Sequence, residues 1–180
     1  MPFGFRQRQE SITKAVYQAY NKDVIMLAAA SNDGSLERMA FPARLNQVLC
    51  VCSADGYGTS SLFNPLPNMA EDNFTILGER VLSAMLGGDR IRKSGTSVAT
   101  AVAAGIAALV LQLGFQRPTK LREADLRSYA GMRAIFVAMS QEQGTFTADG
   151  RYFIRPWILL DRDKDLEYVL MHISYILEKL

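Results

Sequence analysis

The stretch Ser94-Gly95-Thr96-Ser97-Val98-Ala99-Thr100 introduces the most apolar part of the chain, which extends to about residue 113. This part is rich in alanine, at positions 99, 101, 103, 104, 107 and 108. Its composition predicts a helix, and because small side chains let neighbouring backbones approach closely, we expect this helix to lie deep in the fold. Ser97 falls in its predicted first turn, where backbone N–H groups lack intrahelical acceptors and the helix dipole is positive.

Three apolar runs before this helix have the length of strands, namely residues 24–30, 48–51 and 74–77. Runs that are continuously apolar, rather than alternating, are typical of strands covered on both faces, as in parallel sheets. Residues 9–21 have the apolar spacing of an amphipathic helix. Helical and strand patterns thus alternate from residue 9 to 113, which predicts an α/β fold with a mainly parallel sheet flanked by helices.

The C-terminal part is predicted to be mostly helical. One helix covers about residues 122–140, residues 152–160 are strand-like around Pro156, and a last helix carries apolar residues from 166 to 180. A length of 180 residues with 49% hydrophobic and 21% charged residues is that of one globular domain. We therefore predict a single domain over 1–180, with a helical extension at about 118–180.

The charge balance and the apolar runs argue against two classes of partner. Twenty Lys and Arg against 18 Asp and Glu leave a net charge of only +2, so no nucleic-acid partner is expected. The longest uninterrupted apolar run, Ala101–Leu111, is shorter than the roughly 20 residues of a membrane span, so no membrane partner is expected. Residues 1–6 lack the order of a secretory signal, and a cytoplasmic location is favoured.

The two cysteines, Cys50 and Cys52, alternate along one predicted strand and therefore point to the same face. Neighbours on one strand are poorly placed for a disulfide, and two cysteines without a nearby pair of histidines do not form a zinc site. We expect both to be buried core residues. The chain also lacks clustered carboxylates and a phosphate-binding loop, so neither a metal nor a cofactor is expected.

Two polar segments carry the candidate chemistry. Asn32 lies in Ala28-Ala29-Ala30-Ser31-Asn32-Asp33-Gly34, at the end of an apolar run, and Ser97 begins the apolar helix. In open α/β sheets, sites form beyond the carboxyl ends of the strands. A serine at a helix start can attack a carbonyl, and the N–H groups there, with an Asn amide, can stabilise the oxyanion that forms. Asn32 and Ser97 therefore make a coherent pair for acyl transfer.

The order of these segments resembles the subtilisin-like serine peptidases, the subtilases. The resemblance rests on residues 28–34, Phe41-Pro42-Ala43, Ser53-Ala54-Asp55-Gly56 and Gly95-Thr96-Ser97-x-Ala99-Thr100. It covers about residues 3–115 and implies the later part of a subtilisin-like fold.

The same resemblance implies peptide-bond hydrolysis in a peptide or protein substrate. Ser97 corresponds to the family's nucleophile and Asn32 to its oxyanion donor. Phe3-Gly4-Phe5 resembles the strand that lines the substrate. The substrate-binding positions that the resemblance implies are Gly4, Ala30, Ser31 and Thr96.

The chain departs from the family pattern in three respects. Ser31 stands where subtilases usually have Gly, and Ala101 stands where Pro usually follows the serine motif. The family's catalytic Asp and His have no counterpart, since the single histidine is His172, far downstream of Ser97. A serine hydroxyl is a weak nucleophile without an adjacent base. We therefore expect a catalytic domain that is incomplete at its N-terminal side and that works with an upstream half of the same domain.

Three functions remain open. The first is part of a serine endopeptidase that is inactive without its missing half. The second is a catalytically inactive, subtilase-derived module that binds peptides or proteins. The third is a doubly wound nucleotide-binding domain, which ranks below the others because no G-x-G-x-x-G follows a strand.

Several single residues have simpler explanations than catalysis. Lys93 lies four residues before Ser97 and could form a Ser–Lys dyad, but lysines at loop edges are usually solvated. His172 lies beside the apolar stripe of the last predicted helix, where a structural role is expected. Asp33 and Asp55 both precede glycines, which is typical of turns.

Overall fold

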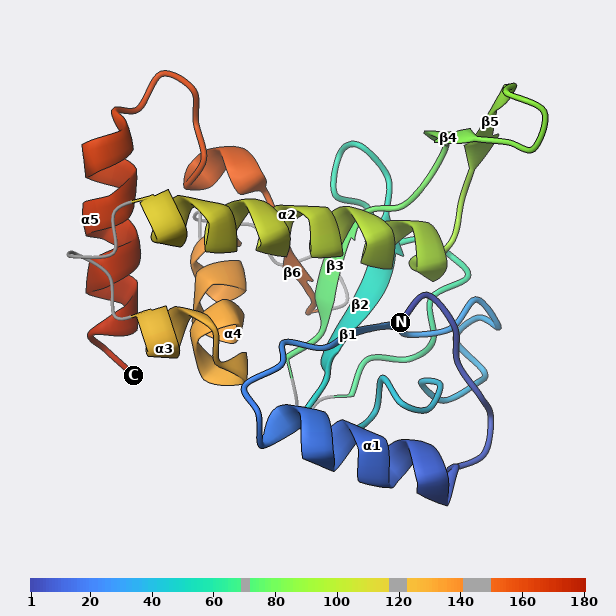
Figure 1. Cartoon of the computed structure of the whole chain (residues 1–180). Helices are drawn as coiled ribbons and strands as arrows, with labels where there is room; N and C mark the ends of the chain where they lie inside the picture. The colour runs from blue at the N-terminus through green and yellow to red at the C-terminus, as the bar shows by residue number, and fades with distance from the viewer. Residues whose placement is uncertain (69–71, 117–122, 141–149) are drawn as a thin grey trace.

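A four-stranded parallel sheet forms the centre of the computed structural model, which describes residues 1–68, 72–116, 123–140 and 150–180 (Figure 1). Its strands are, in spatial order, β1 (Leu27–Ala29), β2 (Leu49–Ala54), β3 (Phe74–Leu77) and β6 (Tyr152–Phe153). All three pairings are parallel, with Ala28 opposite Cys50 and Cys52 opposite Thr75. The structure therefore confirms the α/β fold and the parallel sheet.

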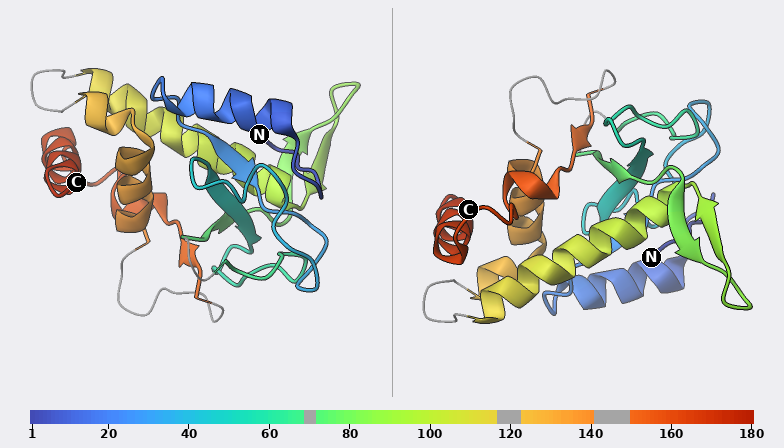
Figure 2. Two further views of the ribbon diagram at one scale, coloured as in Figure 1. Left: turned by 90° about the horizontal axis from the view of Figure 1, so that it is seen from below. Right: turned by 90° about the horizontal axis from the view of Figure 1, so that it is seen from above.

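The sheet is covered on both faces, as the continuous apolar runs predict. The long helix α2 (Thr96–Gln116) packs across β1, β2 and β3 on one face. On the other face, Ala28, Cys50 and Cys52 pack in one cluster with Val16 of helix α1 (Glu10–Tyr20) (Figures 1 and 2). Both cysteines are buried thiols without a disulfide, which confirms the core interpretation.

The connections between the parallel strands differ from the expected alternation. Residues 30–48 link β1 to β2, and residues 55–73 link β2 to β3, without a helix among their described residues. Parallel strands need a long crossover, but the Gly-, Ser-, Asn- and Pro-rich composition of these segments favours turns over helix. The alternation of helical and strand patterns therefore does not extend to these two connections.

A two-stranded antiparallel hairpin was missed by the sequence patterns, which indicated only a loop at residues 87–89. Its strands are β4 (Val81–Ala84) and β5 (Arg90–Lys93). Gly87 and Gly88 lie at its tip with φ of +92° and +90°, a conformation that glycine adopts without steric cost. The hairpin has no run of buried apolar residues, so its strands had no hydrophobic signature to detect.

The C-terminal part contains α3 (Glu123–Leu126), α4 (Tyr129–Ala138), the short 3-10 helix η1 (Pro156–Ile158) and α5 (Leu166–Leu177). The helix predicted over about 122–140 is two helices, because the Ser128 hydroxyl caps α4 by accepting from the Gly131 N–H at 2.9 Å. The strand predicted over 152–160 ends at Phe153, because Pro156 starts η1. Residues 118–122 and 141–149 of the predicted extension lie outside the described residues.

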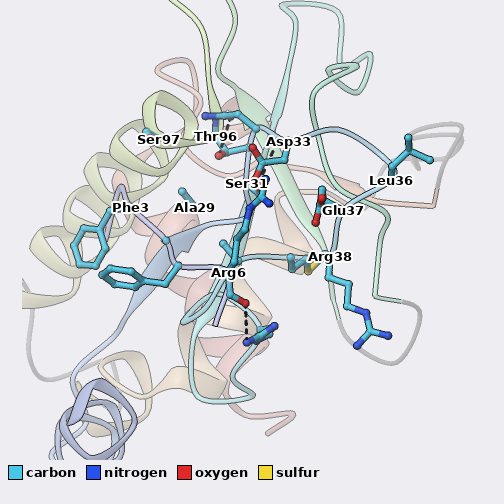
Figure 3. Close-up of a pocket in the computed structure, with 16 residues that line it drawn as sticks. Phe3, Arg6, Ala29, Ser31, Asp33, Leu36, Glu37, Arg38, Thr96 and Ser97 are labelled. Atoms are coloured by element: carbon cyan, nitrogen blue, oxygen red, sulfur yellow. Dashed lines mark hydrogen bonds between the residues drawn. The ribbon is translucent and has the colours of Figure 1, made fainter. Parts of the chain in front are cut away.

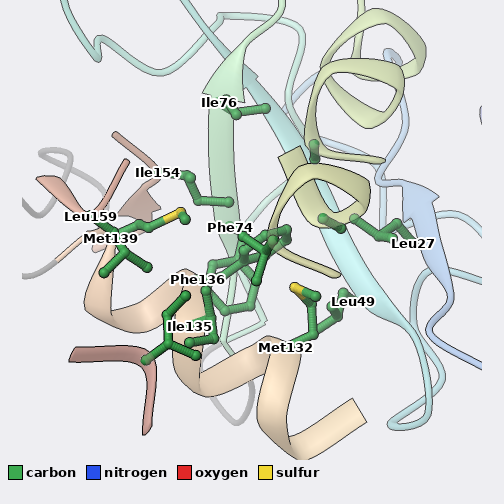
Figure 4. Packing of buried hydrophobic residues seen from close by; sticks show 14 of the residues in the cluster. Leu27, Leu49, Phe74, Ile76, Met132, Ile135, Phe136, Met139, Ile154 and Leu159 are labelled. Atoms are coloured by element: carbon green, nitrogen blue, oxygen red, sulfur yellow. The ribbon is translucent and has the colours of Figure 1, made fainter. Parts of the chain in front are cut away.

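The helices of the extension and the sheet contribute to one hydrophobic cluster (Figure 4). Phe74 of β3 makes an edge-on ring contact with Phe136 of α4, with centroids 5.6 Å apart. Other buried members from the extension are Leu126, Met132, Ile135, Met139, Ile154, Leu159, Val169, Leu170, Ile173 and Leu177.

Helix α2 is buried on only one of its faces, which corrects the expectation of a deeply buried helix. Ala99, Ala103 and Val110 are fully buried against the sheet. The opposite face is exposed and carries Ala101, Ala104, Gly105, Ala108 and Leu109. Residues 96–115 are long and apolar enough to cross a membrane by length and composition, yet their inner face packs on the sheet, as in a core helix.

Candidate functional site

A cleft of about 490 Å³ opens where β1 ends and α2 begins. Its walls come from the N-terminal segment, the loop after β1 and the first turn of α2. Figure 3 shows Thr96 and Ser97 at the helix start, with Phe3 on one side and Leu36, Glu37 and Arg38 on the other. The lining residues are Phe3, Gly4, Phe5, Arg6, Ala29, Ser31, Asn32, Asp33, Leu36, Glu37, Arg38, Met39, Ala40, Arg44, Thr96 and Ser97.

Asn32 is held at the start of α2 by Thr96. The Asn32 Oδ1 accepts hydrogen bonds from the Thr96 N–H at 2.8 Å and from the Thr96 hydroxyl at 3.1 Å. These two bonds fix the orientation of the amide, because only its oxygen can accept. The Asn32 Nδ2 makes no hydrogen bond with a described residue, so both of its hydrogens can be donated to a group in the cleft. Gly95, with φ of +152°, brings its backbone against this amide.

Ser97 lies in the first turn of α2 and lines the same cleft as Asn32. Its backbone N–H has no intrahelical acceptor at this position and is one of the groups that form the positive end of the helix dipole. Its hydroxyl donates to the Pro2 carbonyl oxygen at 2.8 Å. An amide carbonyl accepts a hydrogen bond but is too weak a base to remove the proton, so this contact does not activate the hydroxyl.

Gly4 lies in the N-terminal segment of the cleft wall, directly beside residues 40 and 41 of the loop after β1. Phe5 and Phe41 exchange backbone hydrogen bonds of 2.7 and 2.8 Å, which hold this segment antiparallel to the loop. A Cβ placed on Gly4 would lie 2.5 Å from the Ala40 Cβ. Only glycine fits this close approach, which accounts for its occurrence in the predicted substrate-lining strand.

The other three predicted substrate-binding residues, Ser31, Thr96 and Ala30, differ in their position relative to the cleft. Ser31 lines the cleft with φ of +146°, and its hydroxyl donates to the Asp33 carboxylate at 3.0 Å. Thr96 is 1% exposed and contacts Asn32, so its geometry is that of a positioning residue. Ala30 is fully buried, and Ala29 lines the cleft in its place. The Ala30 carbonyl is engaged by the Ala40 N–H, which keeps this residue beneath the cleft surface.

Among the described residues, the Ser97 hydroxyl has no hydrogen bond to a basic side chain that could take its proton. The single histidine, His172, is on α5, at the end of α2 opposite to Ser97 (Figure 1). Its ring contacts Tyr168, with centroids 6.0 Å apart. Lys93 ends β5, is exposed and makes no hydrogen bond to Ser97. Asp55 accepts from the Tyr57 and Thr59 N–H groups in a turn, as its sequence context predicts.

The part of the cleft wall formed by residues 36–38 of the loop after β1 was not anticipated from the sequence. Leu36, Glu37 and Arg38 line the cleft there, although no motif surrounds them. The contact of Ser97 with Pro2 was also missed, because any residue carries a carbonyl and no side-chain signal marks it. Only the nearness of Pro2 to the substrate-lining segment 3–5 could have suggested this contact.

A family model described as the subtilase family matches residues 1–152. Two curated relatives share about a third of the aligned residues. A thermostable alkaline protease from Halalkalibacterium halodurans is 32% identical over 110 residues, which are 61% of this chain and 30% of that protein. An intracellular serine protease from Paenibacillus polymyxa is 30% identical over 117 residues, which are 63% of this chain and 35% of that protein. The chain thus spans about a third of these relatives.

Solved structures match nearly the whole chain in fold. The prenylagaramide maturation protease PagA superposes with a TM-score of 0.72 at 24% identity, over 97% of this chain and 60% of that one. The PatG macrocyclase in complex with peptide gives a TM-score of 0.70 at 23% identity, over 96% of this chain and 50% of that one. The fold similarity therefore extends beyond residue 152 into the C-terminal helices, whereas the family model ends there.

Proposed function

Because the chain belongs to the subtilase family, we propose that it forms the nucleophile-bearing part of a serine endopeptidase that hydrolyses peptide bonds. Ser97 is the nucleophile, and Asn32 and the Ser97 N–H are the oxyanion donors. The observation that carries this proposal is the pair of hydrogen bonds from Thr96 to the Asn32 Oδ1. They leave the Asn32 Nδ2 to donate beside a helix N-terminus, which is the arrangement an oxyanion requires.

The chemistry follows from these positions. The Ser97 Oγ forms a bond to the scissile carbonyl carbon as its proton passes to a general base. The carbonyl oxygen becomes an oxyanion, which accepts from the Asn32 amide and the Ser97 N–H. Collapse of this intermediate breaks the C–N bond, and the base returns the proton to the departing amine. Water then releases the acyl group from Ser97 by the same sequence of steps.

We infer that the base and its carboxylate partner lie outside these 180 residues, since His172 is the only histidine and lies on α5. We propose that an upstream half of the same domain supplies them. The partial coverage of the relatives is consistent with this, because this chain spans 30% and 35% of the two proteases. In the resting chain, the Pro2 carbonyl accepts the hydrogen bond that such a base would take over.

The exposed apolar surfaces support a second half that packs against this one. The outer face of α2 continues along the helix from Ser97, with Ala101, Ala104 and Ala108 at the following turns. A polypeptide that covered this face would lie next to the Ser97 hydroxyl. A second open apolar groove, of about 490 Å³, runs along α1. It is lined by Met1, Ser11, Ile12, Ala15, Val16, Ala19 and Met26.

A fluorophosphonate probe, which labels activated serines, tests the proposal. The complete protein, with its upstream half, should be labelled at Ser97, and Ser97→Ala should abolish both labelling and peptide cleavage. Ser35→Ala is the matched control, because this exposed serine lies in the loop after β1 and makes no described side-chain contact. Labelling of the complete protein that persists in Ser97→Ala would contradict the assignment of the nucleophile.

A peptide-binding module without catalysis is the second candidate. The inactive contact between Ser97 and the Pro2 carbonyl favours it, because the cleft is formed while the hydroxyl is not activated. The same experiment separates the two candidates. A complete protein that binds peptides, folds cooperatively and resists the fluorophosphonate probe would establish the module instead of the peptidase.

A further inference from the structure

The hairpin β4–β5 projects from the body of the molecule beside the start of α2 (Figures 1 and 2). Its two strands pair only with each other, so both outer edges of this small sheet are open among the described residues. All four residues of β5 are exposed. A two-stranded hairpin is marginally stable alone. The unpaired backbone N–H and C=O groups along its open edges can bind an added strand.

The hairpin carries the charge excess of the whole chain. Between residues 79 and 93 there are four cations and two anions, a net charge of +2, and the remaining residues contain 16 cations and 16 anions. The cations are Arg80, Arg90, Arg92 and Lys93, and none of them forms an ion pair with a described residue. A local excess of unpaired cations attracts an acidic partner, although the net charge of the chain is small.

The register of the hairpin places two of these cations on one face. Leu82 pairs with Arg92 and Ala84 with Arg90, so both guanidinium groups share a face with two apolar side chains. Arg92 donates one hydrogen bond, at 2.8 Å, to the Arg80 carbonyl, which leaves most of its N–H groups to bind a partner. This face can therefore receive carboxylates together with small apolar groups.

The base of the hairpin is fixed to the segment that carries the candidate nucleophile. The Arg80 N–H donates to the Ser94 hydroxyl at 2.9 Å, and the Gly95 N–H donates to the Gly78 carbonyl at 2.9 Å. Ser97 follows two residues later. A polypeptide bound along the hairpin would therefore have one end close to Ser97.

We propose that the β4–β5 hairpin is a docking surface for an extended acidic segment of a peptide ligand. The open strand edges bind its backbone, and Arg90 and Arg92 bind its carboxylates. Asp89 at the tip makes a lipid surface a poorer partner, because it would place a carboxylate at the bilayer boundary. That the ligand is the substrate rests on the proposed function; the docking itself does not.

Fluorescence anisotropy tests the docking on the chain as it exists. The probes are two fluorescein-labelled ten-residue peptides, one with Glu alternating with Thr and one with Lys alternating with Thr. The acidic peptide should bind at least about tenfold more tightly, and its affinity should fall as salt is raised from about 50 to 300 mM. Equal binding of the two peptides would overturn the proposal.

Charge reversal locates the surface. Arg90→Glu/Arg92→Glu should weaken binding of the acidic peptide at least about tenfold. Lys14→Glu/Lys22→Glu makes the same change of charge on and after α1 and should alter binding less than about twofold. Because the reversal could disturb the hairpin, Arg90→Gln/Arg92→Gln is measured as well and should give an intermediate loss. Unchanged binding in both hairpin variants would overturn the assignment.

Two further probes test the class of partner. A single-stranded 20-nucleotide DNA and vesicles containing phosphatidylserine should bind more weakly than the acidic peptide. Tighter hairpin-dependent binding of either probe would overturn the proposal in favour of a nucleic-acid or membrane surface. The labelling of Ser97 in the complete protein does not depend on these results, so the two proposals can fail separately.

Discussion

The two faces of α2 have similar compositions but different environments. On the inner face, Ala99, Ala103 and Val110 are fully buried against the sheet. On the outer face, Ala104 and Leu109 are exposed, and Leu109 retains 59% of its accessible surface. A helix that is apolar all round is normally covered all round. The difference indicates that packing within this chain determines the inner face of α2. The cleft lies at the N-terminal end of the helix, where only Thr96 and Ser97 of α2 line it, and local backbone geometry determines its shape.

The largest expected effect on stability comes from comparing a charged substitution on the buried face of α2 with one on its exposed face. Ala103→Asp places a carboxylate in the core and should destabilise the chain by about 4 kcal/mol or more, or prevent folding. Ala104→Asp, one residue further on the exposed face, should cost about 1 kcal/mol or less. Urea unfolding followed by circular dichroism measures both. Similar losses in the two variants would show that the faces are equally buried in solution.

The same pair of variants sharpens the comparison in the complete protein. If an upstream half covers the outer face of α2, Ala104→Asp should become strongly destabilising there, although the isolated chain tolerates it. An unchanged midpoint in the complete protein would contradict a second half packed on this face.

In the cleft, Asn32 should contribute to the rate of peptide hydrolysis rather than to the stability of the fold. In the complete protein, Asn32→Ala should lower kcat by about 100- to 1000-fold, because one oxyanion donor is lost. The exposed Asn46 provides the control, since Asn46→Ala removes an amide far along the same loop and should leave kcat unchanged. Steady-state hydrolysis of a chromogenic peptide measures both. A loss confined to KM would contradict an oxyanion role, which acts in the transition state.

Gly4 tests a close backbone contact in the wall of the cleft. Gly4→Ala brings a Cβ to 2.5 Å from the Ala40 Cβ and should destabilise the chain by about 1–3 kcal/mol. The double variant Gly4→Ala/Ala40→Gly removes the opposing methyl group and should recover most of that loss. Gly56→Ala is the control, because nothing lies within 4 Å of its added Cβ. Urea midpoints measure the stability of all three variants. A double variant that is no more stable than Gly4→Ala would refute the contact between Gly4 and Ala40.

The same distinction explains what the sequence could predict. The strands β1, β2 and β3 were identifiable because burial on both faces makes them continuously apolar. Asn32 and Ser97 were identifiable because they lie in short motifs that resemble those of the family. The structure brings both residues to one cleft. The assignment of their roles remains a prediction.

Features that depend on backbone shape or on the exposure of an apolar face left no trace in the sequence patterns. No residue of either strand of the hairpin β4–β5 is fully buried, so these strands lack the apolar pattern of core strands. The exposure of the outer face of α2 could not be predicted, because its composition is that of a covered surface. Glu37 and Arg38 line the cleft through the path of a loop that no pattern specifies.

The smallest expected effect concerns Ser31, where the chain departs from the glycine usual in subtilases. Its φ of +146° lies in a region that residues with a Cβ rarely adopt, at a cost of about 1–3 kcal/mol. Ser31→Gly relieves this cost but loses the exposed hydrogen bonds to Asp33, at 3.0 and 3.1 Å, and increases the entropy of the unfolded chain. Each of these losses is about 0.5–1 kcal/mol.

The balance for Ser31→Gly should therefore be a stabilisation of up to about 1 kcal/mol, seen as a higher urea midpoint with an unchanged slope. Ser31→Ala separates the contributions, because it keeps the Cβ at the strained φ while losing the hydroxyl, and it should destabilise. If Gly and Ala both lowered the midpoint, the hydroxyl contacts with Asp33 would outweigh the strain. Opposite signs would show that backbone geometry governs the cleft, in contrast to the packed face of α2.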